Sequence, residues 1–362
     1  MAASPTGGAV TGAAPFLRKT SDMFIDHPVA ARPALVDTFG RHIAYLRVSV
    51  TDRCNYRCTY CLGEHPVFVP KREVLSLDEL DRLCSAFVRC GVRRIRLTGG
   101  EPLTRRNIVS LVRGLARHIE TGALDEITMT TNGSLLGRHA KELADAGMRR
   151  INVSLDTLDP ETFSHITRGG DLTEVLDGID LARDAGLAIK LNTVVQGGMN
   201  DRAIPDLMTY AHARGMDLSL IETMPVGDAV GDRAAGFVPL DRIRDVLDRN
   251  FTLVDLPNRS GGPARYVRVA ETGGRVGFIT PMSHNFCADC NRVRVTCTGR
   301  LVLCLGRIGS VDLRGALRAS EGDDDLMAAI HDAVAQKPQE HSFAVDQLGH
   351  PAIARGMNAT GG

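Results

Sequence analysis

The sequence has no tryptophan, and its aromatic residues amount to only 4%. A protein that binds single-stranded nucleic acid by stacking bases on aromatic rings needs more of them, so we expect no nucleic-acid partner. Net charge is also absent, because Lys plus Arg and Asp plus Glu both number 43. A binding site for an anion must therefore come from a local group of basic residues and not from the charge of the whole chain.

Long hydrophobic runs are missing as well. No apolar stretch reaches the length of a membrane span and no secretory signal opens the sequence, so we expect a cytoplasmic protein with no membrane partner. The first residues are rich in Ala, Gly, Ser and Thr, and we expect a flexible tail over residues 1–35. The length of 362 residues exceeds what one core usually holds, so a large domain with a smaller one is expected.

Cysteine, by contrast, is plentiful and clustered. Six of the nine cysteines fall into two groups, which in a cytosolic chain indicates metal ligands rather than disulfides. The first group is Cys54, Cys58 and Cys61. Three thiolates fall one short of a closed tetrahedral zinc site, whereas a cubane iron–sulfur cluster held by three cysteines leaves one iron open for a further ligand. Ordinary loop cysteines, or a zinc knuckle with a distant fourth ligand, are the alternatives.

The second group, Cys287, Cys290 and Cys304, again offers three thiols. Cys297 lies between them and would complete a four-ligand zinc site, but it falls at the expected tip of a hairpin, so we favour a three-ligand cluster. The metal content separates the two alternatives, because two cubane clusters hold about eight irons per chain.

Periodicity predicts strands that alternate with helices. The expected strands are short β-rich runs at residues 43–50, 94–98, 126–131, 150–154, 188–195 and 217–222. The expected helices between them are residues 76–90, 107–117, 136–146, 173–185 and 204–214. This alternation indicates an α/β fold with a parallel sheet. Six units are too few for a closed eight-stranded barrel, so we predict a partial (β/α)6 barrel of the TIM type; a doubly wound sheet is the alternative.

The pattern changes after Met224. We expect the partial barrel over residues 36–228, a C-terminal cluster-binding extension over residues 229–340 and a tail over residues 341–362. Within the extension the expected helices and strands are residues 240–249, 251–256, 265–269, 276–279, 313–319 and 324–335.

Several basic residues fall inside expected strands, where a buried charge needs a partner. Arg47, Arg96 and Lys190 lie in barrel strands, while Arg292 and Arg294 share one face of a strand beside the second cysteine group. Arginines side by side suit a polyphosphate, because each guanidinium grips phosphate oxygens as a fork. A solvated strand face is the alternative for the last two.

Three features together resemble the radical S-adenosylmethionine (SAM) superfamily and, within it, the GTP 3′,8-cyclases of molybdenum cofactor biosynthesis. The first cysteine group, with Tyr60 before its last cysteine, resembles the superfamily motif, and Gly99-Gly100-Glu101-Pro102 resembles its methionine-binding stretch. The second cysteine group with its embedded Arg-x-Arg resembles a pattern that, together with a terminal Gly-Gly such as Gly361-Gly362, is specific to the cyclases.

The resemblance implies a lyase with two [4Fe-4S] clusters and SAM as cofactors. One electron cleaves SAM at the first cluster to methionine and a 5′-deoxyadenosyl radical, which removes the 3′ hydrogen of GTP. The C3′ radical then attacks C8 of guanine, giving (8S)-3′,8-cyclo-7,8-dihydroguanosine 5′-triphosphate, the first step of molybdopterin biosynthesis. The second cluster would bind and orient the guanine.

The resemblance also assigns residues and partners. Positions that match the family's SAM site are Tyr60, Gly100, Ser154 and Met224. Positions that match its GTP site are Arg47, Arg96, Thr130, Lys190, Arg292 and Arg294. No side chain is assigned as catalytic, since the radical forms at the first cluster. Implied partners besides GTP are an electron donor such as flavodoxin or ferredoxin and the downstream cyclic pyranopterin monophosphate synthase; a homodimer is left open.

Two departures from the family pattern stand out. Ser219 occupies a position where the family usually has an arginine, and the loop at residues 62–65 differs from the usual Met-Pro. The loss of one charge-assisted hydrogen bond would weaken substrate binding by about 1.5–3 kcal/mol. A radical SAM enzyme that modifies a peptide or tetrapyrrole is the rival within enzymes, and a zinc-stabilised binding module is the rival outside them. We further expect Gly361-Gly362 to reach into the active site, against the alternative of a disordered tail.

Overall fold

The computed structural model describes residues 1, 34–63, 65–227, 236–257, 262–344, 353 and 355–361. Those from residue 34 onward belong to one compact unit, Pro33–Gly362. The flexible tail expected over residues 1–35 lies almost entirely outside the described residues, as do Glu64 and Gly362.

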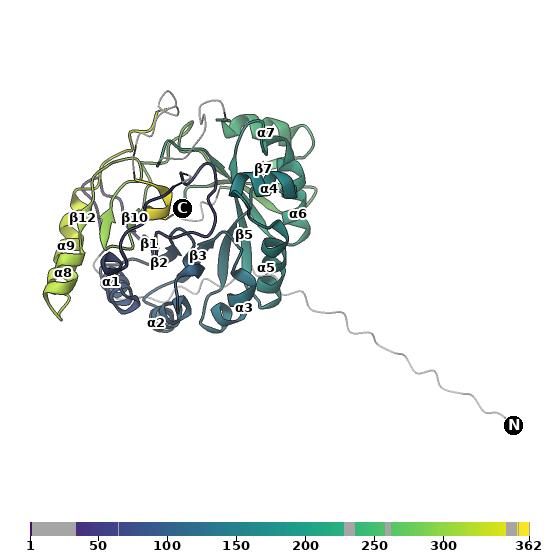
Figure 1. Ribbon diagram of the computed structural model, residues 1–362. Coiled ribbons are helices and arrows are strands. Elements are labelled where there is room, and N and C mark those ends of the chain that lie inside the picture. Colours follow the sequence, from purple (N-terminus) through teal and green to yellow (C-terminus); the bar gives the residue numbers. More distant parts are fainter. Residues whose placement is uncertain are drawn as a thin grey trace. The chain divides into compact units, whose positions relative to one another are not determined.

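One sheet organises the described part of the chain (Figure 1). Its order is β12-β11-β10-β1-β2-β3-β4-β5-β6-β9-β8-β7. In chain order the strands are β1 (Tyr45–Ser49), β2 (Arg94–Thr98), β3 (Glu126–Thr131), β4 (Arg150–Ser154), β5 (Ala188–Val195), β6 (Asp217–Glu222), β7 (Leu253–Asp255), β8 (Arg265–Val269), β9 (Arg275–Ile279), β10 (Arg292–Val295), β11 (Arg300–Val302) and β12 (Val311–Asp312).

Helices cover the outer side of the barrel strands, as Figure 1 shows for those that follow β2 to β5. The helices are α1 (Leu77–Arg89), α2 (Ile108–Glu120), α3 (Leu136–Asp145), α4 (Pro160–Thr167), α5 (Leu172–Asp184), α6 (Ile204–Ala213), α7 (Leu240–Asp248), α8 (Arg314–Ala319), α9 (Asp324–Ala335) and α10 (Met357–Thr360). In the ranges that the structure describes, no helix is long and apolar enough to cross a membrane.

The predicted partial barrel is confirmed. The strands β1 to β6 pair with one another consecutively and in parallel, so the strand-order reversal of a doubly wound sheet is absent from the described residues. The order of the described strands is open-ended, with β12 at one edge and β7 at the other. The C-terminal strands extend this sheet, because β10 pairs in parallel with β1 and β9 pairs in parallel with β6.

Each barrel strand has an apolar outer face and a polar inner face. In β1, Leu46 and Val48 are fully buried in the hydrophobic core, whereas Arg47 between them points to the opposite side of the sheet. Register then aligns the inner faces: Arg47 pairs with Arg96 on β2 and with Arg294 on β10. A buried polar face must satisfy its hydrogen-bonding groups, so the interior of the barrel is the first place to look for a ligand.

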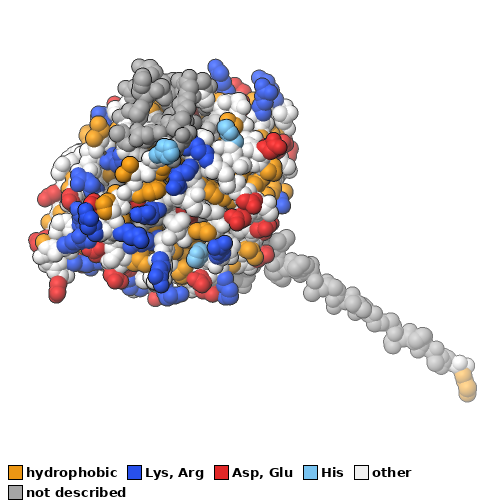
Figure 2. Space-filling view, in the orientation of Figure 1, with side chains coloured by type: hydrophobic (Ala, Val, Ile, Leu, Met, Phe, Trp, Pro, Cys, Tyr) orange, Lys and Arg blue, Asp and Glu red, His pale blue; other side chains and the backbone are white. Residues whose placement is uncertain are grey.

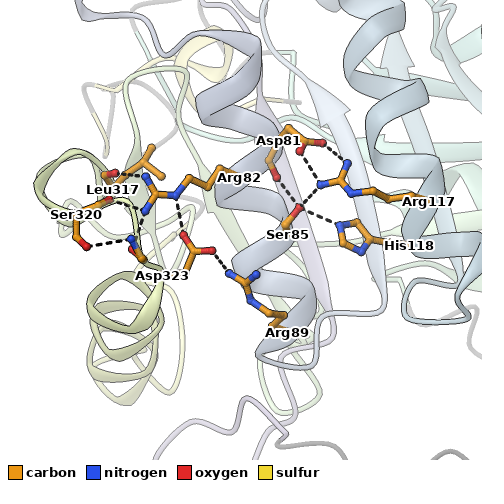
Figure 3. Close-up of polar contacts among 10 residues, drawn as sticks. Asp81, Arg82, Ser85, Arg89, Arg117, His118, Leu317, Ser320 and Asp323 are labelled. Atoms are coloured by element: carbon orange, nitrogen blue, oxygen red, sulfur yellow. Dashed lines mark hydrogen bonds and ion pairs between the residues drawn. The ribbon is translucent and has the colours of Figure 1, made fainter.

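Helix α1 shows how local sequence signals and distant contacts combine. The expected capping box is present, since the Ser76 hydroxyl accepts from the Glu79 amide and the Glu79 carboxylate accepts from the Ser76 amide. One turn later, Arg82 fastens α1 to the α8–α9 region (Figure 3). It donates to Asp323 at 2.6 Å and to backbone carbonyls that include that of Leu317 at 2.8 Å.

Two helices were not expected. Helix α4 begins after the capping residue Asp159, whose carboxylate accepts from the Thr162 amide, and it has Pro160 in its first turn. Both are ordinary start signals that its short length concealed. Helix α10 lies in a tail without apolar periodicity, and the contacts that hold it come from the barrel.

The contacts of Arg82 predict a measurable share of the stability. Replacing Arg82 with Ala removes hydrogen bonds to a carboxylate and to several carbonyls of the α8–α9 region, so we expect the free energy of unfolding to fall by about 1–3 kcal/mol. Urea titration of the anaerobically prepared protein measures it. Lys141→Ala, which breaks the exposed Lys141–Asp145 pair, is the control and should leave the free energy of unfolding nearly unchanged. Equal losses in the two variants would contradict the assignment.

Candidate active site

Both predicted cysteine groups open onto one cavity of about 280 Å³. Cys54, Cys58 and Cys61 come from the loop after β1, while Cys287 and Cys290 precede β10 and Cys304 follows β11. All six line the cavity wall, and none of the cysteines forms a disulfide. Because β10 runs parallel to β1, Cys287 and Cys290 lie toward the end of the barrel where β1 begins, whereas the first group follows the other end of β1. The cavity therefore reaches from one cysteine group to the other.

A close backbone contact shapes the loop that carries the first group. Gly100 lies against the chain at Arg53, where an added Cβ would stand 2.3 Å from the Arg53 carbonyl oxygen. The Gly100 amide donates to the Thr51 carbonyl and the Glu101 amide donates to the Arg53 carbonyl, both at 2.8 Å. Only glycine permits this approach, so the backbone of residues 99–101 holds the start of the cysteine loop in place.

Glu101 links that loop to the end of β3. Its side chain is fully buried and accepts from the Thr131 hydroxyl at 2.8 Å and from the Asn132 amide at 2.7 Å. Burial raises the pKa of Glu101 to about 7, against the opposing effect of these hydrogen bonds. Asn132 in turn lies 3.8 Å from the Cys54 sulfur and donates to Asn55. Sequence reasoning missed Asn132, although it follows a predicted strand end directly.

The positions that match a SAM site gather around the first cysteine group. Tyr60, Gly100, Ser154 and Met224 all line the cavity. Tyr60 is fixed by a 2.8 Å hydrogen bond from its hydroxyl to the buried Asp156. Burial raises the pKa of Asp156 to about 6 and that of Tyr60 well above its usual range. The structure therefore brings these four positions together, and their role in binding SAM stays a prediction.

The surroundings of Cys297 argue against a four-ligand zinc site. Its side chain is buried, and the charges that act on it are those of Asp52 and Arg105. It does not line the cavity onto which Cys304 opens. In the described ranges, no three His, Cys, Asp or Glu side chains converge tightly enough for a single metal ion. A cubane suits three such thiols better, because each cysteine binds a different iron.

The pKa values of the cysteine thiols are compatible with a role as metal ligands, because a bound metal displaces the thiol proton. Burial raises the pKa of Cys54 to about 11 and that of Cys58 well above its usual value. Burial also raises the pKa of Cys290, but the charges of Arg292 and Lys337 outweigh it and lower that pKa to about 7. A bound metal deprotonates its cysteine ligands outright, and neighbouring arginines stabilise the resulting negative charge.

Between the two cysteine groups runs a layer of half-buried cations. Arg294, Arg47 and Arg96 stand at one level on the neighbouring strands β10, β1 and β2. Burial and then the charge of Arg292 lower the pKa of Arg294 to about 10, and burial lowers the pKa of Arg47 and of Arg96 as well. No carboxylate of the described residues forms an ion pair with these three side chains. Such a layer needs an anion.

Unsatisfied polar atoms mark the same inner face. Thirteen buried side-chain nitrogen or oxygen atoms in the described part of the chain have no hydrogen-bond partner. Seven of them lie on the inward side of the barrel strands: Arg47 Nε, Arg96 Nε, Thr128 Oγ1, Thr130 Oγ1, Asn152 Nδ2, Ser219 Oγ and Arg292 Nη1. Native proteins leave few such groups unpaired, so their concentration here indicates a polar ligand.

Two predicted positions lie off the cavity wall. Arg47, Thr130, Arg292 and Arg294 line the cavity, whereas Arg96 and Lys190 do not. The Lys190 ammonium donates to the hydroxyl of Tyr266 on β8, and burial lowers its pKa. Register still places both on the inner face, with Arg96 level with Arg47 and Lys190 level with Asn152.

The C-terminal tail borders the cavity through α10, whereas Gly361 contacts a cavity residue without lining the wall itself. Met357 and Asn358 of α10 line the wall, and Asn358 donates to the Asp52 carbonyl at 3.0 Å. The Gly361 carbonyl accepts from Arg294. An added Cβ at Gly361 would overlap the Thr98 hydroxyl at 1.8 Å, and its φ of +77° also favours glycine. Gly362 lies outside the described residues.

Two family models match successive parts of the chain, and known proteins match nearly all of it. The Radical SAM superfamily model matches residues 48–211, and the Molybdenum Cofactor Synthesis C model matches residues 216–343. A GTP 3′,8-cyclase of Agrobacterium fabrum is 59% identical over 329 residues, which cover 91% of this chain and 94% of the relative. The chain belongs to the GTP 3′,8-cyclase family. Its radical SAM assignment is thereby confirmed.

Other GTP 3′,8-cyclases match this chain to a similar extent. That of Mesorhizobium japonicum is 58% identical, with 91% of this chain and 99% of the relative covered, and that of Brucella canis is 57% identical, with 92% and 97% covered. Among solved structures, Streptococcus suis SuiB bound to precursor peptide SuiA has a TM-score of 0.58 at 15% identity, covering 87% of this chain and 75% of SuiB. At that identity the likeness shows the shared fold alone.

The different surroundings of Cys297 and Cys304 predict different effects on iron content. After anaerobic reconstitution we expect about eight irons per chain, because each cubane holds about four. Cys304→Ser should lower the count to about four, since it removes one of three ligands of the second cluster. Cys297→Ser is the matched control and should retain about eight. Iron analysis with the absorbance spectrum measures both. A zinc content near two without iron absorbance, or equal losses in the two variants, would contradict the ligand assignment.

Proposed function

We propose that the chain is a GTP 3′,8-cyclase, a lyase that converts GTP to (8S)-3′,8-cyclo-7,8-dihydroguanosine 5′-triphosphate in the first step of molybdopterin biosynthesis. The observation that carries the proposal is that two three-cysteine groups face one cavity with a layer of half-buried arginines beside them. Membership in the cyclase family supports it. The division into a barrel at residues 36–228 and an extension at residues 229–340 remains part of the proposal.

Cys54, Cys58 and Cys61 would hold the first [4Fe-4S] cluster, which together with SAM and one electron supplies a 5′-deoxyadenosyl radical. The chain's own part is to hold SAM in one pose. Ser154 offers a hydroxyl from the end of β4 and Met224 an apolar wall beyond β6. The bond from Tyr60 to Asp156 keeps the cysteine loop against the barrel. These contacts favour a radical that forms next to the substrate and away from water.

Cys287, Cys290 and Cys304 would hold the second [4Fe-4S] cluster at the other side of the cavity. Arg47, Arg96, Arg294 and Lys190 supply positive charge along the inner face, and a triphosphate supplies the matching negative charge. Arg292 lies over the Phe286 ring at 5.1 Å and lines the same cavity. The unpaired Thr130 hydroxyl is placed to bond a ribose or phosphate oxygen.

Ser219 lies on the inner face of β6, where it is fully buried. A serine there leaves the phosphate charge to the remaining cations Arg47, Arg96, Arg294 and Lys190. The electron donor, the downstream synthase and a homodimer remain predictions from the resemblance, and the cytoplasmic location remains a prediction from the composition of the sequence. Figure 2 shows Lys and Arg interspersed with Asp and Glu over the displayed face, in keeping with the zero net charge.

The rival within enzymes is a radical SAM enzyme that modifies a peptide or tetrapyrrole. SuiB was solved bound to a precursor peptide, but the likeness of this chain to SuiB concerns the fold. A buried row of arginines suits a polyphosphate better than a neutral peptide, and the family match is to cyclases.

Incubation of the reconstituted protein with GTP, SAM and a chemical reductant tests the proposal. We expect the cyclic dihydropterin precursor and 5′-deoxyadenosine together. Arg292→Ala should raise the Kd for GTP by about 10- to 100-fold, because a charge-assisted hydrogen bond contributes about 1.5–3 kcal/mol, while SAM cleavage without GTP and the iron content persist. Arg300→Ala is the control, since Arg300 is exposed and bonds Ser310. No product from wild type, or no effect of Arg292→Ala, would overturn the proposal.

A further inference from the structure

Asn152 is a polar residue of the inner face that neither the sequence motifs nor the cavity lining singles out. It lies in the middle of β4 and is fully buried. Its Nδ2 has no hydrogen-bond partner among the described residues. A buried amide that makes only half of its hydrogen bonds is destabilising, so its presence at the centre of the sheet needs an explanation.

An ion pair fixes the orientation of this amide. Arg150, two residues earlier on the same face, donates from Nη1 to Asn152 Oδ1 at 3.2 Å. The other nitrogens of Arg150 are held by both carboxylate oxygens of Glu126 on β3, each at 2.9 Å. Arginine has donors and no acceptor, so the amide atom that faces it must be the oxygen. Nδ2 is therefore directed away from Arg150, as a donor.

The acceptor that this donor needs is negatively charged. Asn152 pairs in the sheet with Thr130 on one side and Lys190 on the other. The Lys190 ammonium is close enough to Arg96 and Arg150 for both to lower its pKa, after the larger effect of burial. An amide hydrogen among three cations is best matched by an oxygen of the substrate's phosphates.

We propose that Asn152 binds a phosphate oxygen of the nucleotide through Nδ2, and that Arg150 with Glu126 acts as a positioning pair that orients the amide. The inference rests on the proposed function, and it adds a neutral donor to the cationic site. Hydrogen bonds of this kind set direction where point charges do not, so Asn152 would fix where the triphosphate lies and hence how far C3′ stands from the first cluster.

Asn152→Leu tests the binding role, because leucine keeps the volume and removes the donor. We expect the Kd for GTP to rise by about 10- to 100-fold, and the competition constant of inorganic triphosphate to rise by a similar factor. Iron content and 5′-deoxyadenosine formation without GTP should persist, which shows that the variant is folded. An unchanged Kd, no competition by inorganic triphosphate in wild type, or weakened GTP binding with unchanged triphosphate binding would overturn the assignment.

A double-mutant cycle tests the positioning pair. Arg150→Gln should raise the Kd for GTP, and the variant that combines it with Asn152→Leu should bind no worse than Asn152→Leu alone. Multiplying effects would mean that Arg150 contacts the substrate itself, against the proposal. Arg93→Gln is the control: Arg93 also pairs with a carboxylate, that of Asp125 before β3, and should leave the Kd unchanged.

Product formation by the wild-type protein distinguishes a failure of the proposed function from a failure of the Asn152 assignment. If wild type forms no cyclic product, the proposed function fails. If wild type forms the product and Asn152→Leu binds GTP equally well, only this inference fails.

Discussion

The burial of positive charge inside the barrel is the constraint on which the rest of the structure depends. Arg47, Arg96 and Arg294 stand side by side on three adjacent strands, where desolvation lowers the pKa of each. An uncompensated buried charge is strongly destabilising. The fold tolerates the layer because helices bury the other face of the same strands and so hold the sheet together from outside. An anionic substrate then supplies the missing partner.

The C-terminal third of the chain makes this interior into a site. Strand β10 adds Arg294 beside Arg47, and the second cysteine group next to it lines the cavity from the end of the barrel where β1 begins. Strand β9 extends the opposite edge next to β6, and β8 brings Tyr266 to Lys190. The tail returns so that the Gly361 carbonyl accepts from Arg294. The barrel strands alone would leave the cation layer incomplete and open.

The barrel strands, the two cysteine groups and part of the cation layer were predictable from the sequence. The strands β2 to β6 have the predicted bounds because Gly or Asn marks most of the junctions and apolar residues alternate along the strands. The two cysteine groups were recognisable because three thiols in so short a span have few other uses. Arg47 and Arg292 were recognisable because an arginine inside an apolar strand needs a partner.

Other features depend on distant contacts that a sequence does not display. No local sequence signal near Arg292 shows that β10 pairs with β1 as well as with β11, the other strand of its hairpin. The buried Glu101 and Asn132 look like ordinary residues after a strand until the cysteine loop packs on them. Asn152 is polar like many strand residues, and only the bond from Arg150 shows which way its amide faces. Arg96 and Lys190 share the inner face but do not line the cavity, a difference that periodicity cannot show.

The central claim is that one cavity places the carbon C3′ of GTP within reach of the radical formed at the first cysteine group. Incubation of the reconstituted protein with SAM, reductant and GTP carrying deuterium at C3′ tests this directly. Mass spectrometry of the 5′-deoxyadenosine should find one deuterium from the substrate, with the cyclic product formed in parallel. Unlabelled 5′-deoxyadenosine beside a GTP that keeps its deuterium would contradict the account.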